Sequence, residues 1–201
     1  HSIHHYCLRE WLALANPALA QSIQIKTLAP PYMVEALKNH LIDGFCVGEP
    51  WNTQAELQGF SHIVCASQDI IPNVADKVLA VTEEWAQLHP HTLIALTHAL
   101  LKAQQELREL EDFAPVWQLL YEFEIIQFDC SSEIHVEKYF NIQNIIRNFV
   151  KDNAEPKATD FEWLFQQMQK WNHAPTHLTK AHQPGLNCVL LGHYHSAYQA
   201  L

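Results

Sequence analysis

The chain has 201 residues, of which 48% are hydrophobic and 17% are charged, and this composition excludes a disordered polypeptide. The 22 acidic residues outnumber the 12 basic ones and give a formal net charge of −10, which excludes a surface built to neutralise nucleic-acid phosphates. No stretch reaches the roughly 18 consecutive apolar residues that a membrane-spanning helix requires. We therefore expect a folded protein that makes no direct contact with nucleic acid.

The first 82 residues alternate between two hydrophobic periods. Helical spacing occurs at residues 3–16, 32–41 and 49–57. Strand-like segments, either alternating or short and apolar, occur at residues 22–28, 44–48, 61–66 and 78–81. Because helices and strands follow one another in turn, the pattern predicts an α/β fold with largely parallel strands.

Beyond residue 82, helical spacing predominates. Thr82 is a capping residue followed by two acids, and Pro90 begins a long amphipathic run. Further helices are predicted at residues 113–123, 136–150 and 159–171. Residues 172–201 show no clear period, so we expect a surface tail or a short terminal element there.

The segment 43–52 is the most informative part of the chain and reads Asp-Gly-Phe-Cys-Val-Gly-Glu-Pro-Trp-Asn. An apolar run ends at Gly48, Glu49 follows, and Pro50 can begin a helix. The backbone N–H groups and the positive end of the helix dipole at such a junction suit a small anion or polar solute. The alternative is that Gly48 only permits a tight turn and that Trp51 only fills the core.

Lys77 stands out because no other Lys or Arg occurs between Lys38 and Lys102, in a stretch rich in acidic residues. Its ammonium group is the countercharge that an anionic ligand in this region needs. The alternative is a solvated loop lysine beside Asp76.

Histidine and catalytic motifs give weaker signals. His4 and His5 lie where the first helix begins, and an imidazole there can donate a hydrogen bond into a cleft. No GxSxG, HExxH, P-loop or GxGxxG motif is present, so we do not expect an enzyme. The histidines and the cysteine near the C-terminus lack the paired spacing of a structural zinc site. We therefore expect neither a metal nor a cofactor. The residues of this group are His182, Cys188, His193 and His195.

Two stretches, residues 29–38 and 42–52, closely resemble the nitrate-binding family of solute-binding proteins. That family contains the nitrate and bicarbonate receptors of cyanobacterial ABC transporters and the cytoplasmic nitrate/nitrite sensors of bacterial assimilation operons. His4 and the Arg-Glu-Trp-Leu-Ala string at residues 9–13 resemble the family's histidine-bearing turn and first helix. The string Gly-Phe-Cys-Val-Gly-Glu-Pro-Trp is the most specific part, and the likeness covers most of residues 1–171.

The resemblance implies a periplasmic-binding-protein-like type II architecture, here a partial two-lobe one with a largely helical C-terminal half. Residues 1–82 are then expected to form an α/β lobe with part of the anion cleft. Residues 83–171 are expected to form a helical return segment of the second lobe, and residues 172–201 a tail. Family members are longer, so we expect the chain to be N-terminally incomplete.

The resemblance also implies a ligand, nitrate or nitrite, and a set of residues that bind it. In the family, the lysine that matches Lys77 contacts nitrate. By the same transfer, His4 is expected to donate a hydrogen bond to the ligand, and Gly48, Glu49 and Trp51 are expected to shape the cleft wall or the hinge.

Three functions remain open at this point. The first is the periplasmic solute-binding component of an ABC transporter, whose partner is the transporter permease. The second is a cytoplasmic nitrate/nitrite sensor that regulates a protein partner, an RNA-binding antiterminator, and the five cysteines lean towards that compartment. The third is an enzyme of the thiamine-precursor synthase type, which requires a cysteine-rich iron-binding string that the sequence does not contain.

Overall fold

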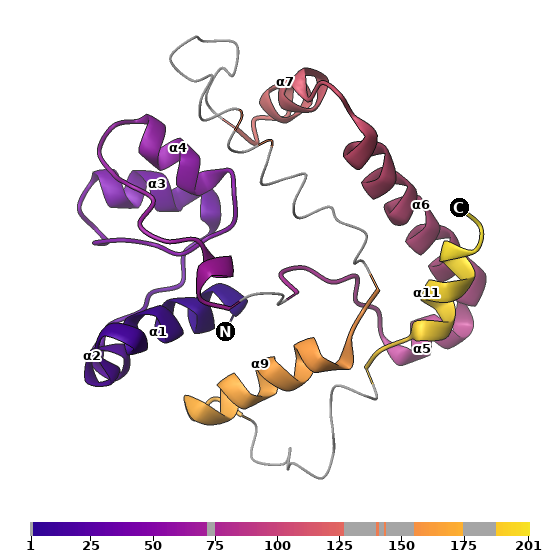
Figure 1. The fold of residues 1–201 in the computed structure, drawn as a ribbon, viewed down its shortest axis with the longest axis horizontal. Helices are drawn as coiled ribbons and strands as arrows, with labels where there is room; N and C mark the ends of the chain where they lie inside the picture. Colours follow the sequence, from indigo (N-terminus) through magenta and orange to yellow (C-terminus); the bar gives the residue numbers. More distant parts are fainter. Residues whose placement is uncertain (1, 72–74, 127–139, 141–142, 144–154, 175–187) are drawn as a thin grey trace. The chain divides into compact units, whose positions relative to one another are not determined.

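The computed structural model describes residues 2–71, 75–126, 140, 143, 155–174 and 188–201 (Figure 1). The chain divides into two compact units. The first unit comprises His1–Asn73 and Glu111–Ile146, and the second comprises Val74–Leu110 and Arg147–Leu201. In both units, the described residues form helices joined by irregular segments.

Paired helices build the first unit. Helix α1 packs beside α2, and α3 packs beside α4 (Figure 1). Tyr6 of α1 and Ala20 of α2 are both buried, and the guanidinium group of Arg9 donates a hydrogen bond to the Ala20 carbonyl, which ties the two helices together. The helical elements of this unit are α1 (Ile3–Ala15), α2 (Pro17–Ser22), α3 (Pro30–Lys38), α4 (Trp51–Leu57), the 3-10 turn η1 (Ser67–Asp69) and α7 (Ala114–Glu122).

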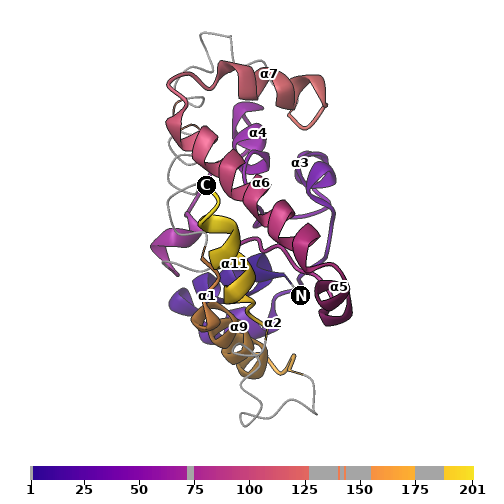
Figure 2. The same ribbon diagram turned by 90° about the vertical axis from the view of Figure 1, so that its right-hand side faces the viewer.

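A long helix, α6, organises the second unit. Helix α11 lies along α6 in both views (Figures 1 and 2), and the Nδ1 atom of His98 lies 3.2 Å from the carbonyl oxygen of Ala197. Ala197 is completely buried, because its small side chain lets the two helices approach closely. The helices of this unit are α5 (Glu83–Leu88), α6 (Pro90–Glu109), α9 (Ala158–Lys170) and α11 (Leu191–Tyr198).

Local capping determines where several helices begin. The side-chain oxygen of Asn16 accepts hydrogen bonds from the backbone N–H groups of Ala18 and Leu19, which starts α2. The hydroxyl of Thr82 accepts a hydrogen bond of 3.2 Å from the N–H group of Trp85 and starts α5, and Pro90 is the first residue of α6. The predictions for Thr82 and Pro90 are therefore confirmed.

The predicted α/β fold class is wrong for the described residues, which contain no strand. The expected periplasmic-binding-protein-like type II architecture is wrong for these residues as well. Backbone angles near the expected strands are extended, as at Ile23 (ψ 137°) and Ala66 (ψ 144°), but the segments form no ladder. Alternating side chains require only an extended backbone, whereas a strand requires a hydrogen-bonded neighbour. Val64 and Val78 are 76% and 55% exposed, so these segments also lack the burial typical of parallel strands.

The helices expected in the C-terminal half were predicted more accurately. The predicted helices at 113–123 and 159–171 correspond to α7 and α9. The helix predicted at 136–150 lies outside the described residues, except for positions 140 and 143. Residues 172–201 include the short terminal helix α11. The expected boundaries after residues 82 and 171 stay predictions. Among the described helices, none combines the length and the apolar character needed to cross a membrane.

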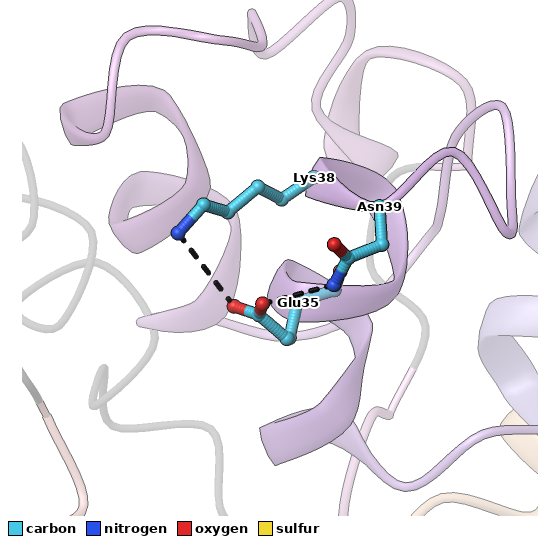
Figure 3. A network of polar contacts seen from close by, with 3 residues as sticks. All are labelled: Glu35, Lys38 and Asn39. Carbon is cyan, nitrogen blue, oxygen red and sulfur yellow. Dashed lines mark hydrogen bonds and ion pairs between the residues drawn. The ribbon is translucent and has the colours of Figure 1, made fainter.

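The end of α3 shows how a helix stops here without glycine. His40 has a φ of +56°, in the left-handed region, and Leu41 N–H donates to the Ala36 carbonyl, which closes a Schellman motif. Asn39 directly precedes His40, and its Nδ2 atom donates a hydrogen bond to a carboxylate oxygen of Glu35, one turn earlier in α3. The other carboxylate oxygen of Glu35 lies 4.0 Å from the ammonium of Lys38 (Figure 3). A side chain with a Cβ atom is strained in the left-handed region, so His40 costs stability.

We predict that His40→Gly raises the free energy of unfolding by about 1 kcal/mol, because glycine adopts a positive φ without steric strain. Denaturant-induced unfolding followed by circular dichroism measures this effect. The control is Lys38→Gly, which introduces glycine two positions earlier, inside the helix, and should lower the free energy of unfolding by about 1 kcal/mol. Equal destabilisation by both variants would contradict the left-handed conformation of His40.

Candidate functional site

The candidate site is built around the Gly48 turn, which we define as residues 47–52 and which includes the first two residues of α4. The Nδ2 atom of Asn52 donates a hydrogen bond of 2.7 Å to the carbonyl oxygen of Val47 and so joins the two ends of the turn. One side chain thus fixes the path of the four residues between them, Gly48 to Trp51. Asparagine commonly stabilises turns in this way, because its short amide reaches nearby backbone groups.

The carboxylate of Glu49 caps α4. Its Oε2 atom accepts a hydrogen bond of 3.1 Å from the backbone N–H group of Thr53, in the first turn of the helix. Thr53 is only 3% exposed, so this bond is shielded from water. The sequence led us to expect N–H groups at this helix start to face a solute. One of them is already engaged by a negative charge of the protein itself.

Partial burial raises the pKa of the Glu49 carboxyl group, because removal from water disfavours the ionised form. Hydrogen bonds from Thr53 and Asn52 oppose this shift, and the nearby carboxylate of Glu56 adds to it. The charge environment of the Gly48 turn is therefore negative, and its carboxyl group takes up a proton more readily than a solvated glutamate.

The structure brings two predicted site residues together, His4 of α1 and Gly48. A Cβ atom placed on Gly48 would lie 3.9 Å from the Nε2 atom of His4, which is ordinary van der Waals contact. The Nε2 edge of the imidazole therefore lies beside the backbone of the turn. This arrangement places a hydrogen-bonding nitrogen beside the turn.

The two adjacent histidines of α1 have different surroundings. The Nε2 atom of His5 accepts a hydrogen bond of 2.9 Å from the Nε atom of Arg9, and Arg9 in turn contacts α2. His5 thus belongs to the internal packing of α1 and α2, whereas His4 lies against Gly48. The sequence alone did not distinguish the two residues.

Trp51 and Lys77 are the other two residues that the sequence predicted for the site. Trp51 is the first residue of α4 and is half-buried. Lys77 belongs to the second unit, its side chain is 76% exposed, and its Nζ atom lies 2.7 Å from a carboxylate oxygen of Asp76. That pairing is what a solvated lysine beside Asp76 would show. The role of Lys77 in ligand binding stays a prediction, as do the roles of the other four residues.

Sequence reasoning missed two contributors to the turn, Asn52 and Thr53. Both follow the Gly-Glu-Pro-Trp string, and an Asn just after a proline turn is a usable signal. The backbone role of Thr53 left no signal, because every residue type except proline can donate its N–H group.

The histidine-rich C-terminal region makes a polar contact with Glu155. The Nε2 atom of His195 lies 3.2 Å from a carboxylate oxygen of Glu155. His182 lies outside the described residues. Within the part of the chain that the structure describes, no group of three or more His, Cys, Asp or Glu side chains could hold a metal ion.

Comparison with known proteins links the chain to anion transport. It is 33% identical over 184 residues to the bicarbonate transport ATP-binding protein CmpC of Synechocystis sp., covering 87% of this chain and 27% of that protein. It is 29% identical over 185 residues to the nitrate import ATP-binding protein NrtC of the same organism, covering 86% and 27%. It is 25% identical over 183 residues to the Synechocystis nitrate/nitrite binding protein NrtA, covering 86% and 41%.

The chain thus spans about a quarter of the first two relatives and about two fifths of the third. No solved structure gives a significant match. The relatives confirm the resemblance to solute-binding proteins of nitrate and bicarbonate transport. A family-level match to the NMT1-like family extends over residues 1–120, more than half of the sequence, and the chain therefore belongs to the NMT1-like family.

Proposed function

We propose that the chain binds a small oxyanion, nitrate or nitrite, as the solute-recognising part of an ABC transport system. The single observation that carries this proposal is the position of the His4 imidazole against Gly48, in the turn that the sequence marks as most specific. The names of the relatives, which include nitrate/nitrite binding proteins and bicarbonate and nitrate transport proteins, support the same chemistry.

The residues of the proposed site supply part of what a bound nitrate requires. Nitrate is a planar anion with a single charge and no hydrogen-bond donor, so it requires N–H groups and one cation. His4 supplies a ring nitrogen at the turn. That Lys77 supplies the ammonium is part of the proposal and rests on the sequence. At an effective dielectric constant of about 20, an ammonium roughly 4 Å from the anion contributes on the order of 4 kcal/mol before desolvation. We propose that binding occurs without catalysis, since the sequence carries no catalytic motif of the kinds considered above.

A second candidate function is favoured by the relatives named as ATP-binding proteins. The chain covers 27% of CmpC and of NrtC, and it contains no P-loop. The same stretch is similar to a nitrate/nitrite binding protein, so the shared part suits solute recognition better than ATP binding. As the second candidate we propose an anion sensor, in which this solute-recognising stretch regulates a protein partner of the transport system.

The two candidates imply different locations and partners. We propose a periplasmic location with a permease partner for the receptor, and a cytoplasmic location with a regulatory protein partner for the sensor. Fractionation of cells that express the full-length protein separates them, because a cytoplasmic chain has no access to a periplasmic solute.

The proposed function is tested first at Lys77. We predict that Lys77→Glu abolishes nitrate binding, because it replaces the countercharge of the anion by a like charge. Isothermal titration calorimetry of the full-length protein with sodium nitrate measures the affinity. The matched control is Lys102→Glu, the same charge change at an exposed position of α6 in the same unit, which should leave the affinity nearly unchanged. Equal affinities of wild type and Lys77→Glu would remove Lys77 from the site.

The second test concerns His4. We predict that His4→Ala weakens nitrate binding by about 1 to 3 kcal/mol, because the anion loses one hydrogen-bond donor. The matched control is His62→Ala in the same unit, whose side chain is 92% exposed. If both variants bind nitrate equally well, His4 has a packing role only.

A further inference from the structure

The C-terminal end of α7 exposes large apolar side chains that the proposed anion site does not use. Four of them lie within residues 119–125, and each is between 41% and 69% exposed: Leu119, Tyr121, Phe123 and Ile125. Single exposed apolar residues are common on protein surfaces, whereas several close together with a polar border are typical of a binding surface. We call residues 119–125 the α7 end.

Two backbone hydrogen bonds fix the shape of the α7 end. Glu124 has a φ of +56°, in the left-handed region. The N–H group of Ile125 donates a hydrogen bond of 2.9 Å to the Leu120 carbonyl, and that of Glu124 donates one of 3.0 Å to the Tyr121 carbonyl. These are the two bonds of a Schellman motif. The next residue, Ile126, is buried, so the exposed side chains belong to a helix end that is anchored on its far side.

Leu119 and Phe123 share one face of α7. The N–H group of Phe123 donates a hydrogen bond of 3.0 Å to the Leu119 carbonyl, so the helical turn continues up to Phe123. Residues four apart in a helix lie one above the other, and residues three apart are also neighbours. Glu122 therefore borders this face, and its carboxylate accepts a hydrogen bond of 2.9 Å from the Nε2 atom of Gln118.

The charge around this apolar face is negative. No Lys or Arg occurs in the sequence between Arg108 and Lys138. Residues 111–124 contain acidic residues only, all of them exposed: Glu111, Asp112, Glu122 and Glu124. An apolar surface with an acidic border and no basic residue in the same stretch favours an occupant that brings positive charge.

We propose that the α7 end is a docking surface for a partner protein, which binds through a segment that combines apolar side chains with Lys or Arg. The apolar side chains supply buried contact area, and the acids select for positive charge. A second copy of this chain would bring the same acids and a formal net charge of −10 to the interface. Anionic lipids and nucleic acids also carry the wrong sign. The proposal does not depend on the binding of nitrate.

Two synthetic peptides test this proposal on the full-length protein by fluorescence anisotropy. The first probe is a designed amphipathic helix of Leu and Lys, about 18 residues long, and the second carries Glu in place of every Lys. The wild type should bind the Leu/Lys probe, less tightly as the concentration of sodium chloride rises, and should not bind the Leu/Glu probe. No binding of the Leu/Lys probe, or equal binding of both probes, would overturn the proposal.

Variants of the α7 end assign the binding to this surface. Phe123→Ser should weaken binding of the Leu/Lys probe by about tenfold or more, because it removes the most exposed apolar side chain of the α7 end. The matched control is Tyr32→Ser, at another aromatic residue of the same unit that is 68% exposed, and it should leave the affinity unchanged. Equal affinities of wild type and Phe123→Ser, or equal weakening by the control, would remove the α7 end from the interaction.

A charge reversal separates docking from a folding defect. The double variant Glu122→Lys, Glu124→Lys should lose the Leu/Lys probe and gain the Leu/Glu probe, and unfolding cannot produce that gain. Failure to gain the Leu/Glu probe, with the circular dichroism of the wild type retained, would show that the acids do not select the partner and would overturn the proposal.

The other occupants are tested in the absence of peptide. A dimer in sedimentation velocity that Phe123→Ser dissociates would assign the α7 end to a second copy. Binding to vesicles of phosphatidylcholine and phosphatidylglycerol that Phe123→Ser abolishes would assign it to a membrane. Either result would overturn the proposal. All these measurements are made without nitrate, so their failure leaves the proposed function intact, and an absence of nitrate binding would leave the docking surface intact.

Discussion

The hydrogen bond between the Thr53 N–H group and the Glu49 carboxylate is the interaction on which the candidate site depends. It fixes the start of α4, and the bond from Asn52 to the Val47 carbonyl holds the preceding backbone. Together they hold the backbone around Gly48, which lies beside the His4 imidazole. Without these bonds, a segment with no strand partner would have little to hold it in one conformation.

The same hydrogen bond has a disadvantage for anion binding. A carboxylate that caps a helix is favourable for the helix dipole, but it places a negative charge where a negative solute is proposed to bind. Lys77, the proposed countercharge of the anion, belongs to the other unit and contacts Asp76.

Helix packing and the ends of helices determine the structure within each of the two units. In the first unit, Arg9 joins α1 to α2, and in the second, the buried Ala197 lets α11 lie on α6. The α3 helix ends at a non-glycine residue in the left-handed region. This helix therefore ends through a backbone geometry that its residue types do not favour, and local residue preference alone would not have indicated it.

The local sequence determined those features that depend only on interactions between residues close together in the chain. Thr82 and Pro90 start α5 and α6, and hydrophobic spacing located α7 and α9, because capping and helical periodicity act within a few residues. The specific string around Gly48 likewise marked the turn. Tertiary structure decided the rest. Alternation at residues 22–28 and 61–66 indicates extended backbone but cannot supply a hydrogen-bonded neighbour, so the predicted strands are absent from the described residues. The fold separates His4 from His5: His4 lies beside Gly48, which is distant in the sequence, whereas His5 accepts a hydrogen bond from Arg9, one turn further along α1.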